Sequence, residues 1–254
     1  MPSENESGLM VQGVSVRYGS LVVLENTNAV FPDSGVHLIV GKNGSGKTTL
    51  FNAINELIPV ESGSMCIREG NQEFRWGSEE FRTRVYYLPS DFYLPQYMTG
   101  DEYAQFVLSG YPSSKREAIS PVADALGMAD AMRNLIETYS FGMKKKLQFI
   151  ALLASGATYA IADEPFSGLD IETALLMEEV IARMQKTRSF IVVTHDVSMI
   201  DRFPTDIHVM EKGRLTDFDG ASHELLELLR KEGGTNVDAE RIITSLGADE
   251  VLSQ

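Results

Sequence analysis

The stretch Gly41–Thr49, which reads GKNGSGKTT, constrains the fold of this chain more than any other. An apolar run of strand length, Val36–Val40, precedes it, and Thr49–Leu57 follows it with apolar residues at helical spacing. Glycines let a loop between strand and helix turn tightly and present its N–H groups to phosphate oxygens, which the positive helix end also attracts. Lys47 can reach the β- and γ-phosphates, and the Thr48 hydroxyl can bind Mg²⁺. The sequence therefore predicts a nucleoside triphosphate site here, in preference to a plain Gly/Ser-rich turn.

Composition narrows the class of protein. The 254 residues suffice for one large domain or two modest ones, and 43% hydrophobic with 23% charged residues is typical of a soluble globular chain. No apolar run approaches the length of a membrane-spanning helix, and the acidic, polar start of the chain argues against a secretory signal. A net charge of −14 argues against non-specific nucleic-acid binding, which needs a basic face. The single cysteine, Cys66, excludes an internal disulfide and fits a reducing cytoplasm.

The strand signals predict an α/β fold with a mostly parallel sheet. Short apolar runs at Tyr159–Ala162, Phe190–Thr194 and Ile207–Glu211 have the length of strands buried on both faces. A helical stretch, Ile171–Met184, separates the first two, which is the alternation of a parallel α/β sheet. Gly213 marks a hairpin that leads into one more strand, Arg214–Phe218.

The remaining strand signals include one pair that is predicted to be antiparallel. Leu9–Arg17 and Leu21–Phe31 alternate around a Gly19-Ser20 turn, which predicts a hairpin. Ser64–Arg68 and Val85–Leu88 read as further short strands, and residues 70–77 between them as a loop or hairpin.

Residues 90–150 change character and predict a helical insertion between the two halves of the sheet. Thr99–Glu102 is a capping box ahead of an apolar-periodic stretch. Ser114–Glu117 reads as a second box, ahead of a helix that Pro121 limits or kinks. A third helix is expected from Phe141 to about Ala154.

The domain organisation follows from these elements. We expect a flexible leader over residues 1–8, one domain over residues 9–227 that contains the helical insertion, and a tail over residues 228–254. An amphipathic helix is expected at Ser222–Lys231.

Two carboxylates, Asp163 and Glu164, directly follow the apolar strand Tyr159–Ala162. Sites in open α/β sheets gather at the carboxyl ends of strands. Asp163 could hold Mg²⁺ through water, and Glu164 could accept a proton from the water that attacks the γ-phosphate. Alone, such a pair is usually a solvated turn, but the phosphate loop upstream favours the catalytic interpretation.

His195 follows the strand Phe190–Thr194. A lone histidine is more often structural than catalytic, yet at the carboxyl end of a strand in the same sheet a γ-phosphate contact is favoured. His208 lies within a strand pattern, and neither it nor His37 nor His223 is assigned a role.

Ser140 and Gly142 stand at the start of the predicted helix at Phe141. A hydroxyl and free N–H groups that point the same way can form a second anion site. From physics alone, a plain helix cap is the better interpretation.

In this order, the motifs resemble those of the nucleotide-binding subunit of an ABC transporter, from about Leu9 to Glu227. Gly41–Thr49 resembles its Walker A loop, Tyr159–Glu164 its Walker B strand, Ser167–Asp170 its D-loop and His195 its H-loop. The resemblance implies a P-loop ATPase fold of the ABC type, with ATP and Mg²⁺ as cofactors.

The resemblance also assigns roles to residues. Lys47, Glu164 and His195 would be catalytic, and Tyr18 stands where the family stacks an aromatic ring on adenine. Thr48, Asp163 and Ser90 would contact Mg²⁺ or its waters. The residues assigned to ATP are Tyr18, Gly41, Lys42, Asn43, Gly44, Ser45, Gly46, Lys47, Thr48, Thr49, Ser140, Gly142 and Asp170.

Two departures from the family pattern matter. The signature, usually LSGGQ, reads YSFGM at Tyr139–Met143, and this form resembles exporters of the ABC-2 kind, including multidrug and bacteriocin-immunity systems. The Q-loop glutamine is replaced by Ser90, which is too short to fill both glutamine roles, contact with Mg²⁺-bound water and the relay to the membrane partner. Asp91 or Gln96 could contribute instead.

The resemblance further implies partners. Two such chains, identical or different, would dimerise head to tail, with Ser140 and Gly142 of one closing on the γ-phosphate held by the other. Closure would drive a separate integral membrane permease through helical residues near 90–110. The chain would then be cytoplasmic and peripheral on the inner face of the cell membrane. Lys144–Lys146 would be a solvated face of the signature helix and not a nucleic-acid contact.

Three functions are compared. The first is an ATPase subunit that energises a separate membrane exporter. The alternative is a soluble ABC ATPase that acts on a non-transport machine. Translation factors of this kind usually have tandem domains and repair proteins have long coiled coils, and this sequence shows neither. Iron–sulfur cluster assembly is therefore the main function considered under this alternative. The third is a degenerate subunit that binds ATP but hydrolyses it poorly. The complete Walker A loop, Glu164 and His195 argue against it for this chain's own ATP, while the signature leaves it open for the site across the interface.

Overall fold

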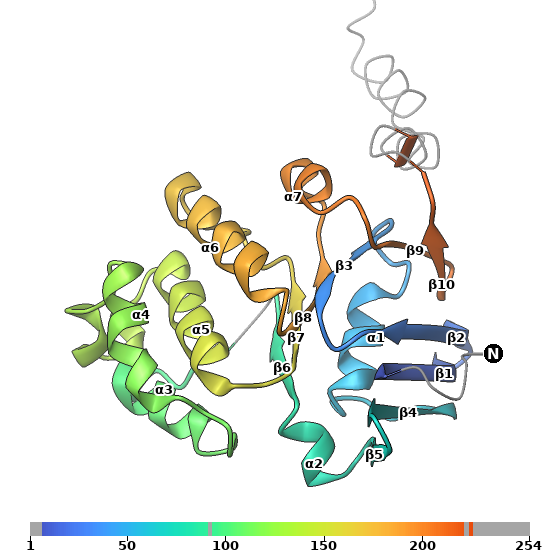
Figure 1. The fold of residues 1–254 in the computed structure, drawn as a ribbon, viewed down its shortest axis with the longest axis horizontal. Coiled ribbons are helices and arrows are strands. Elements are labelled where there is room, and N and C mark those ends of the chain that lie inside the picture. The colour runs from blue at the N-terminus through green and yellow to red at the C-terminus, as the bar shows by residue number, and fades with distance from the viewer. Residues whose placement is uncertain (1–6, 91–92, 221–223, 226–254) are drawn as a thin grey trace, which may run out of the picture.

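Two β-sheets and a group of helices form the protein, and the computed structural model describes them over residues 7–90, 93–220 and 224–225 (Figure 1). The larger sheet has six strands in the order β10-β9-β3-β8-β7-β6. All neighbours from β9 to β6 pair in parallel, and β10 alone pairs antiparallel, through the hairpin at Gly213. The strands are β3 (Gly35–Val40), β6 (Val85–Leu88), β7 (Tyr159–Asp163), β8 (Ser189–Val193), β9 (Ile207–Glu211) and β10 (Arg214–Phe218). The predicted parallel sheet is therefore confirmed.

This sheet separates two hydrophobic cores. In β3, Leu38 and Val40 face a core shared with the helical group, whereas Ile39 faces a core shared with the second sheet. Alternation of faces along a strand produces this division. Every residue of β7 and β8 is buried, as expected for strands covered on both sides.

The second sheet is antiparallel, with the order β2-β1-β4-β5. Its strands are β1 (Gly8–Tyr18), β2 (Leu21–Phe31), β4 (Ser62–Glu69) and β5 (Gln72–Arg75), which confirms the hairpin at Gly19-Ser20. Strands β4 and β5 form a second hairpin, and its turn and second strand lie within residues 70–77. Helix α1 (Lys47–Ile54) buries Leu50, Phe51 and Ile54 in the core between the two sheets.

The predicted helical insertion lies on the opposite side of the central sheet from the antiparallel sheet (Figure 1). It contains α3 (Gly100–Leu108), α4 (Ile119–Ala125) and α5 (Phe141–Ser155), with 3₁₀ turns at Arg116–Ala118, Ala131–Arg133 and Ile136–Thr138. The capping box at Thr99 and Glu102 is confirmed, because the Thr99 hydroxyl accepts from Glu102 N–H and the Glu102 carboxylate accepts from Thr99 N–H.

The second predicted capping box is wrong. The Ser114 hydroxyl donates to the Leu108 carbonyl oxygen at 3.2 Å, back toward α3, and so does not cap the next helix. Lys115 N–H bonds the Ala154 carbonyl oxygen at 2.8 Å, and a 3₁₀ turn without a side-chain cap follows. A tertiary contact to α5 therefore overrides the local signal. Pro121 falls in the first turn of α4, where its missing N–H is tolerated.

Helix α6 (Ile171–Met184) has the predicted bounds, and two short helices, α2 (Glu79–Arg82) and α7 (Val197–Arg202), complete the structure. The expected leader reaches Gly8, where β1 begins, and its residues 1–6 lie outside the described residues. The expected tail, and the helix expected at Ser222–Lys231 apart from residues 224–225, also lie outside them. In the described part of the chain, none of the helices combines the length and apolar character that a membrane crossing requires.

Candidate nucleotide site

The loop of residues 41–46, here called the phosphate loop, connects β3 to α1 and depends on glycine at both ends. Gly46 is the N-cap of α1 at φ 113°, and a Cβ there would lie 2.9 Å from Leu24 Cδ2. A Cβ on Gly41 would lie 2.3 Å from the Met210 carbonyl oxygen. Both positions therefore require glycine. The close packing that glycine allows keeps the loop N–H groups beside the positive N-terminal end of α1.

The Lys47 side chain folds back over this loop. Its Nζ donates to the carbonyl oxygens of Gly41 at 2.6 Å and Lys42 at 2.9 Å. Burial lowers the pKa of Lys47, and the charges of Asp163 and Glu164 oppose that shift. The ammonium group thus stands at the centre of the loop, where it can exchange carbonyl contacts for phosphate oxygens.

Two further observations fit a phosphate ligand in this loop. The Ser45 hydroxyl is buried and has no hydrogen-bond partner among the described residues. Space around Gly44 is open, since a Cβ there would meet no atom within 4 Å. A buried polar atom without a partner and an empty space beside loop N–H groups are what a bound anion would satisfy.

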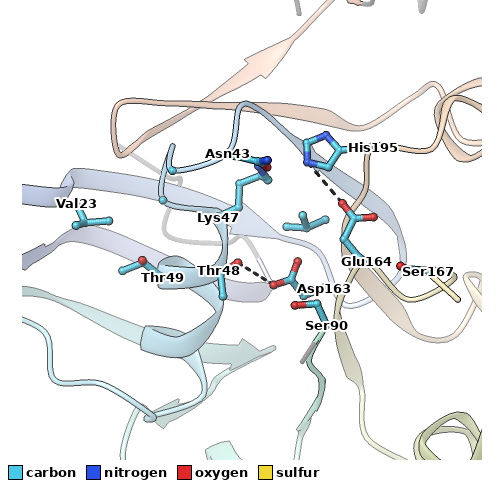
Figure 2. Close-up of a pocket in the computed structure, with 13 residues that line it drawn as sticks. Val23, Asn43, Lys47, Thr48, Thr49, Ser90, Asp163, Glu164, Ser167 and His195 are labelled. Atoms are coloured by element: carbon cyan, nitrogen blue, oxygen red, sulfur yellow. Dashed lines mark hydrogen bonds and ion pairs between the residues drawn. The ribbon is translucent and has the colours of Figure 1, made fainter. Parts of the chain in front are cut away.

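Asp163 ends β7 beside the first turn of α1. Thr48 Oγ1 donates to Asp163 Oδ2 at 2.8 Å, and Ser90 follows the adjacent strand β6 at the same sheet edge (Figure 2). A hydroxyl and a carboxylate in contact supply the oxygen ligands that Mg²⁺ prefers.

Glu164 and His195 face each other across the ends of β7 and β8 (Figure 2). Glu164 Oε1 lies 3.6 Å from His195 Nε2 and is a buried atom without a hydrogen-bond partner among the described residues. Glu164 adopts φ 48°, an uncommon conformation for a residue other than glycine, with its N–H bonded to the Val193 carbonyl oxygen. Burial and the neighbouring Asp163 raise the pKa of Glu164, while burial and Lys47 lower the pKa of His195.

These groups line one open cavity of about 410 Å³ (Figure 2). It brings together most of the predicted site, namely Asn43, Gly44, Gly46, Lys47, Thr48, Thr49, Ser90, Asp163, Glu164 and His195. Gly41, Lys42 and Ser45 belong to the phosphate loop without lining the cavity, and half-exposed Tyr18 lies at the end of β1 outside it. Ser167, the first residue of the segment that resembles the D-loop, lines it as well. Val23 and Val193 also line it, and the sequence had not pointed to them as site residues.

The structure describes only one of the two proposed substitutes for the Q-loop glutamine. Asp91 lies outside the described residues, and Gln96 is not among the lining residues. The Gln96 carbonyl oxygen instead accepts from Glu137 N–H at 3.1 Å.

Ser140, Gly142 and Asp170 also lie outside this cavity. The Ser140 hydroxyl accepts from Met143 N–H at 3.2 Å and caps α5, as physical reasoning alone had favoured. Asp170 caps α6 by accepting from Thr173 N–H at 2.8 Å, and it pairs with Lys146 at 3.6 Å. Residues 167–170, which resemble the D-loop, lie close to the start of α5. A Cβ added to Gly142 would be only 3.3 Å from the Gly168 carbonyl oxygen.

The prediction that Lys144–Lys146 form a solvated helix face is wrong for Lys145. Lys145 is 0% exposed, and its Nζ donates to the backbone carbonyl oxygen of Glu164 at 2.9 Å. A signal was available: Lys145 shares a helix face with buried Phe149, four residues later. Lysine can occupy such a face because its long apolar stem packs while its ammonium reaches a polar group.

Comparison with known proteins decides the family. The profile of the ABC transporter family matches residues 24–167, more than half of the chain. The chain belongs to the ABC transporter family. It carries that family's ATP-binding domain, whose members hydrolyse ATP to power transport, and the predicted ATPase is thereby confirmed.

Named relatives of this ABC protein cover most of its length. A probable ATP-dependent transporter, ycf16, of Cyanidium caldarium is 27% identical over 83% of this chain and 89% of its own. The lantibiotic transport ATP-binding protein SrtF of Streptococcus pyogenes is 25% identical over 88% of this chain and 96% of its own. The ferric enterobactin transport ATP-binding protein FepC of Escherichia coli is 22% identical over 88% of this chain and 85% of its own.

Solved structures confirm the fold. An ATP-binding subunit of an ABC transporter superimposes with a TM-score of 0.78 at 22% identity, over 88% of this chain and all of the other. A nucleotide-free ATP-binding cassette from an ABC transporter gives a TM-score of 0.68 at 17% identity, over 89% and 95%. The parallel sheet, the antiparallel sheet and the helical insertion are thus the layers of an ABC ATPase.

Proposed function

We propose that this chain is the ATP-hydrolysing subunit that energises a separate integral membrane permease, working from the cytoplasmic face of the membrane. The observation that carries the proposal is the position of Glu164 Oε1, buried without a partner and 3.6 Å from His195 in the cavity that holds Lys47. An acceptor held ready beside the phosphate loop is what activation of an attacking water requires. Relatives named as transport ATP-binding proteins support the coupling to a permease.

In this proposal each group of the cavity has one task. The loop N–H groups and Lys47 bind the β- and γ-phosphates. Tyr18, which lies outside the cavity at the end of β1, stacks on the adenine. Glu164 accepts the proton of the attacking water, and His195 contacts the γ-phosphate. The raised pKa of Glu164 strengthens it as a base, since a weaker acid has a more basic conjugate.

Mg²⁺ would be held by the oxygen atoms of Thr48 and Asp163, with Ser90 close to its waters. The hydrogen bond of 2.8 Å from Thr48 Oγ1 to Asp163 Oδ2 supports this assignment, because the two oxygen atoms lie close enough to contact one ion. Bound there, the ion would neutralise charge on the phosphate oxygens.

We further propose that two nucleotide-binding chains close head to tail over ATP. Ser140 is exposed and, with Gly142, lies outside its own chain's cavity. The N-terminus of α5 is a helix end suited to anions, and a second chain could bring a γ-phosphate to it. Asp170, in contact with Lys146 of α5, would lie at the same interface.

The direction of transport is proposed to be export. The signature YSFGM, followed by KKKL, is the feature that supports it, because this form resembles exporters of the ABC-2 kind. Among the relatives, SrtF is named for lantibiotic transport.

A pull-down with the Glu164→Gln chain tests the function. This substitution keeps the side-chain size and removes the base, so ATP should bind without turnover and hold the closed dimer. With ATP and Mg²⁺ added to native membranes, we expect a polytopic membrane protein to co-purify, and mass spectrometry would identify it. Glu172→Gln, an exposed carboxylate at the start of α6, is the matched control and should hydrolyse ATP at the wild-type rate. Recovery of iron–sulfur assembly proteins without a membrane protein would overturn the proposal.

A further inference from the structure

His37, Asp206 and His208 form a compact cluster at the end of the central sheet opposite the phosphate loop. His37 lies near the start of β3, Asp206 immediately precedes β9, and His208 is the second residue of β9. One ligand atom of each residue lies within 4.8 Å of the other two. Gly41 follows His37 by four residues along β3, about 13 Å at the rise of an extended strand. The cluster is thus separate from the ATP cavity.

One ring nitrogen of each histidine, here called the inner nitrogen, faces the carboxylate of Asp206, and the other is called the outer nitrogen. His37 Nδ1 lies 2.5 Å from Asp206 Oδ2, and His208 Nε2 lies 3.2 Å from Asp206 Oδ1. The second contact is an ion-pair contact, and His208 Nε2 is a buried atom to which no hydrogen bond from the described residues is assigned. His208 itself is only 5% exposed. A buried nitrogen held only by such a contact can still take a better-aligned partner.

The outer nitrogen atoms of both histidines meet hydrogen-bond acceptors. His208 Nδ1 lies 2.8 Å from Asp217 Oδ1 in β10, and His37 Nε2 lies 3.3 Å from the Ser34 carbonyl oxygen. The Asp217 carboxylate favours a proton on the outer nitrogen of His208 and leaves the lone pair of a neutral ring on Nε2. His37 Nδ1 is hydrogen-bonded to Asp206, so a metal ion would displace the proton of that bond, and the remaining ring proton would face the Ser34 carbonyl oxygen from Nε2. An outer acceptor that fixes the tautomer in this way is the usual support of a metal-bound histidine.

We propose that His37, Asp206 and His208 bind one divalent transition-metal ion, with Zn²⁺ as the representative. Two imidazoles and one carboxylate suit such ions and not Mg²⁺ or Ca²⁺, which prefer oxygen ligands alone. Tetrahedral Zn²⁺ with bonds of about 2.0–2.2 Å places neighbouring ligand atoms roughly 3.3 Å apart. The separation of 3.2 Å between His208 Nε2 and Asp206 Oδ1 already fits. His37 Nδ1 contacts the other carboxylate oxygen, Oδ2, at 2.5 Å and must move away from it to bind the same ion.

Solvent can reach this position. Asp206 and His208 line a cavity of about 670 Å³ together with Asp217, and the side chain of Asp206 is 42% exposed. A water molecule from this cavity would complete the coordination as the fourth ligand.

The ion would stabilise the part of the central sheet that contains β3, β9 and β10. Two of its ligands come from β3 and β9, the third is the residue before β9, and Asp217 of β10 supports His208. Phe31 of β2 packs edge-on against both imidazoles, with ring centroids 5.8 Å from His37 and 5.4 Å from His208. Metal binding should therefore raise the melting temperature of the whole domain.

Zinc titration of the metal-free chain by calorimetry tests the proposal. All chains carry His195→Ala, because that histidine and the carboxylates of the ATP cavity could bind zinc themselves. We expect one Zn²⁺ per chain, a higher melting temperature, and shifted imidazole NMR signals of His37 and His208. Excess Mg²⁺ should not compete.

Substitutions separate a built site from surface binding. Asp206→Asn and His208→Asn should each weaken zinc binding at least about 100-fold, and Asp217→Asn about 10- to 100-fold. Circular dichroism would verify folding, and half-exposed Asp206 keeps the test open if the buried His208 variant misfolds. Glu211→Gln, an exposed carboxylate of β9 paired with Lys212, is the matched control and should bind as the parent does. The proposal is overturned if the parent binds zinc no more tightly than about 1 mM, or if Asp206→Asn binds it equally well.

Discussion

The ammonium group of Lys145 donates a hydrogen bond of 2.9 Å to the backbone carbonyl oxygen of Glu164. Lys145 belongs to α5, the helix that begins with the signature residues, and it is completely buried. Glu164, the proposed base, stands at φ 48°, a conformation that its surroundings must hold. The contact therefore ties the helical insertion directly to the backbone that positions the base.

Replacement of Lys145 by methionine should separate ATP hydrolysis from ATP binding. Methionine keeps the packing of the stem and removes the donor, so the Glu164 carbonyl oxygen loses a hydrogen bond from a charged group, about 1.5–3 kcal/mol in general. We expect kcat to fall roughly 10- to 100-fold while KM for ATP changes little. Steady-state hydrolysis by the purified chain measures both.

Two variants control this experiment. Lys145→Arg retains a buried cation and should recover part of kcat, whereas Lys144→Met, at a half-buried position of the same helix, should behave as wild type. Equal losses of kcat in the two methionine variants would show that α5 is merely destabilised and that the contact to Glu164 has no positioning role.

Lys47→Ala should abolish tight ATP binding. Its ammonium stands inside the phosphate loop, and charge-assisted bonds to two phosphate groups make a loss of roughly 100-fold or more in affinity the expected result. Equilibrium binding of a fluorescent ATP analogue measures it. Lys42→Ala is the matched control, because the Lys42 side chain is exposed and only its backbone belongs to the loop. Unchanged affinity of Lys47→Ala would refute the phosphate-loop assignment.

The capping box of α3 gives a pH-dependent prediction. Hydrogen bonds from the Thr99 backbone and hydroxyl lower the pKa of Glu102 below its ordinary value of 4.5. A carboxyl with a lowered folded-state pKa contributes stability above its unfolded pKa and loses it as the pH falls through the folded value. Glu102→Gln should therefore melt at a lower temperature than wild type at pH 7, and the difference should vanish well below pH 4.5.

Glu117 provides the control for that measurement. It occupies the same place in the second box-like sequence, Ser114–Glu117, for which the structure shows no side-chain cap. Glu117→Gln should leave the melting curve unchanged at both pH values. A pH-independent difference between wild type and Glu102→Gln would mean that the carboxylate charge is not what stabilises the cap.

The elements that could be predicted from the sequence are those determined by the pattern of neighbouring residues. Ile171–Met184 has helical periodicity between a capping aspartate and the next strand, and β7 and β8 are continuous apolar runs, so their positions were predictable. The phosphate loop was predictable because few alternatives to glycine satisfy its geometry.

The parts that did not follow depend on contacts between distant segments. The environment of Lys145 is set by the packing of α5 against the turn after β7, and Ser114 is oriented by α3. The cluster of His37 and His208 exists because β3 and β9 pair in parallel, a register that neither histidine reveals alone. Single-residue patterns contain no information about such pairings.

Ser90→Gln should increase ATP turnover if Ser90 occupies the Q-loop position. Ser90 follows β6 and lines the cavity beside Asp163, but its side chain is short. A glutamine amide extends farther toward the position proposed for Mg²⁺-bound water, and one added hydrogen bond of about 0.5–1.5 kcal/mol corresponds to a two- to tenfold rise in kcat. Ser90→Leu has similar bulk without the amide and should give no increase. If the basal rate and the rate stimulated by the membrane partner are both unchanged in Ser90→Gln, position 90 has no part in coupling, and the relay to the permease lies elsewhere in the helical insertion.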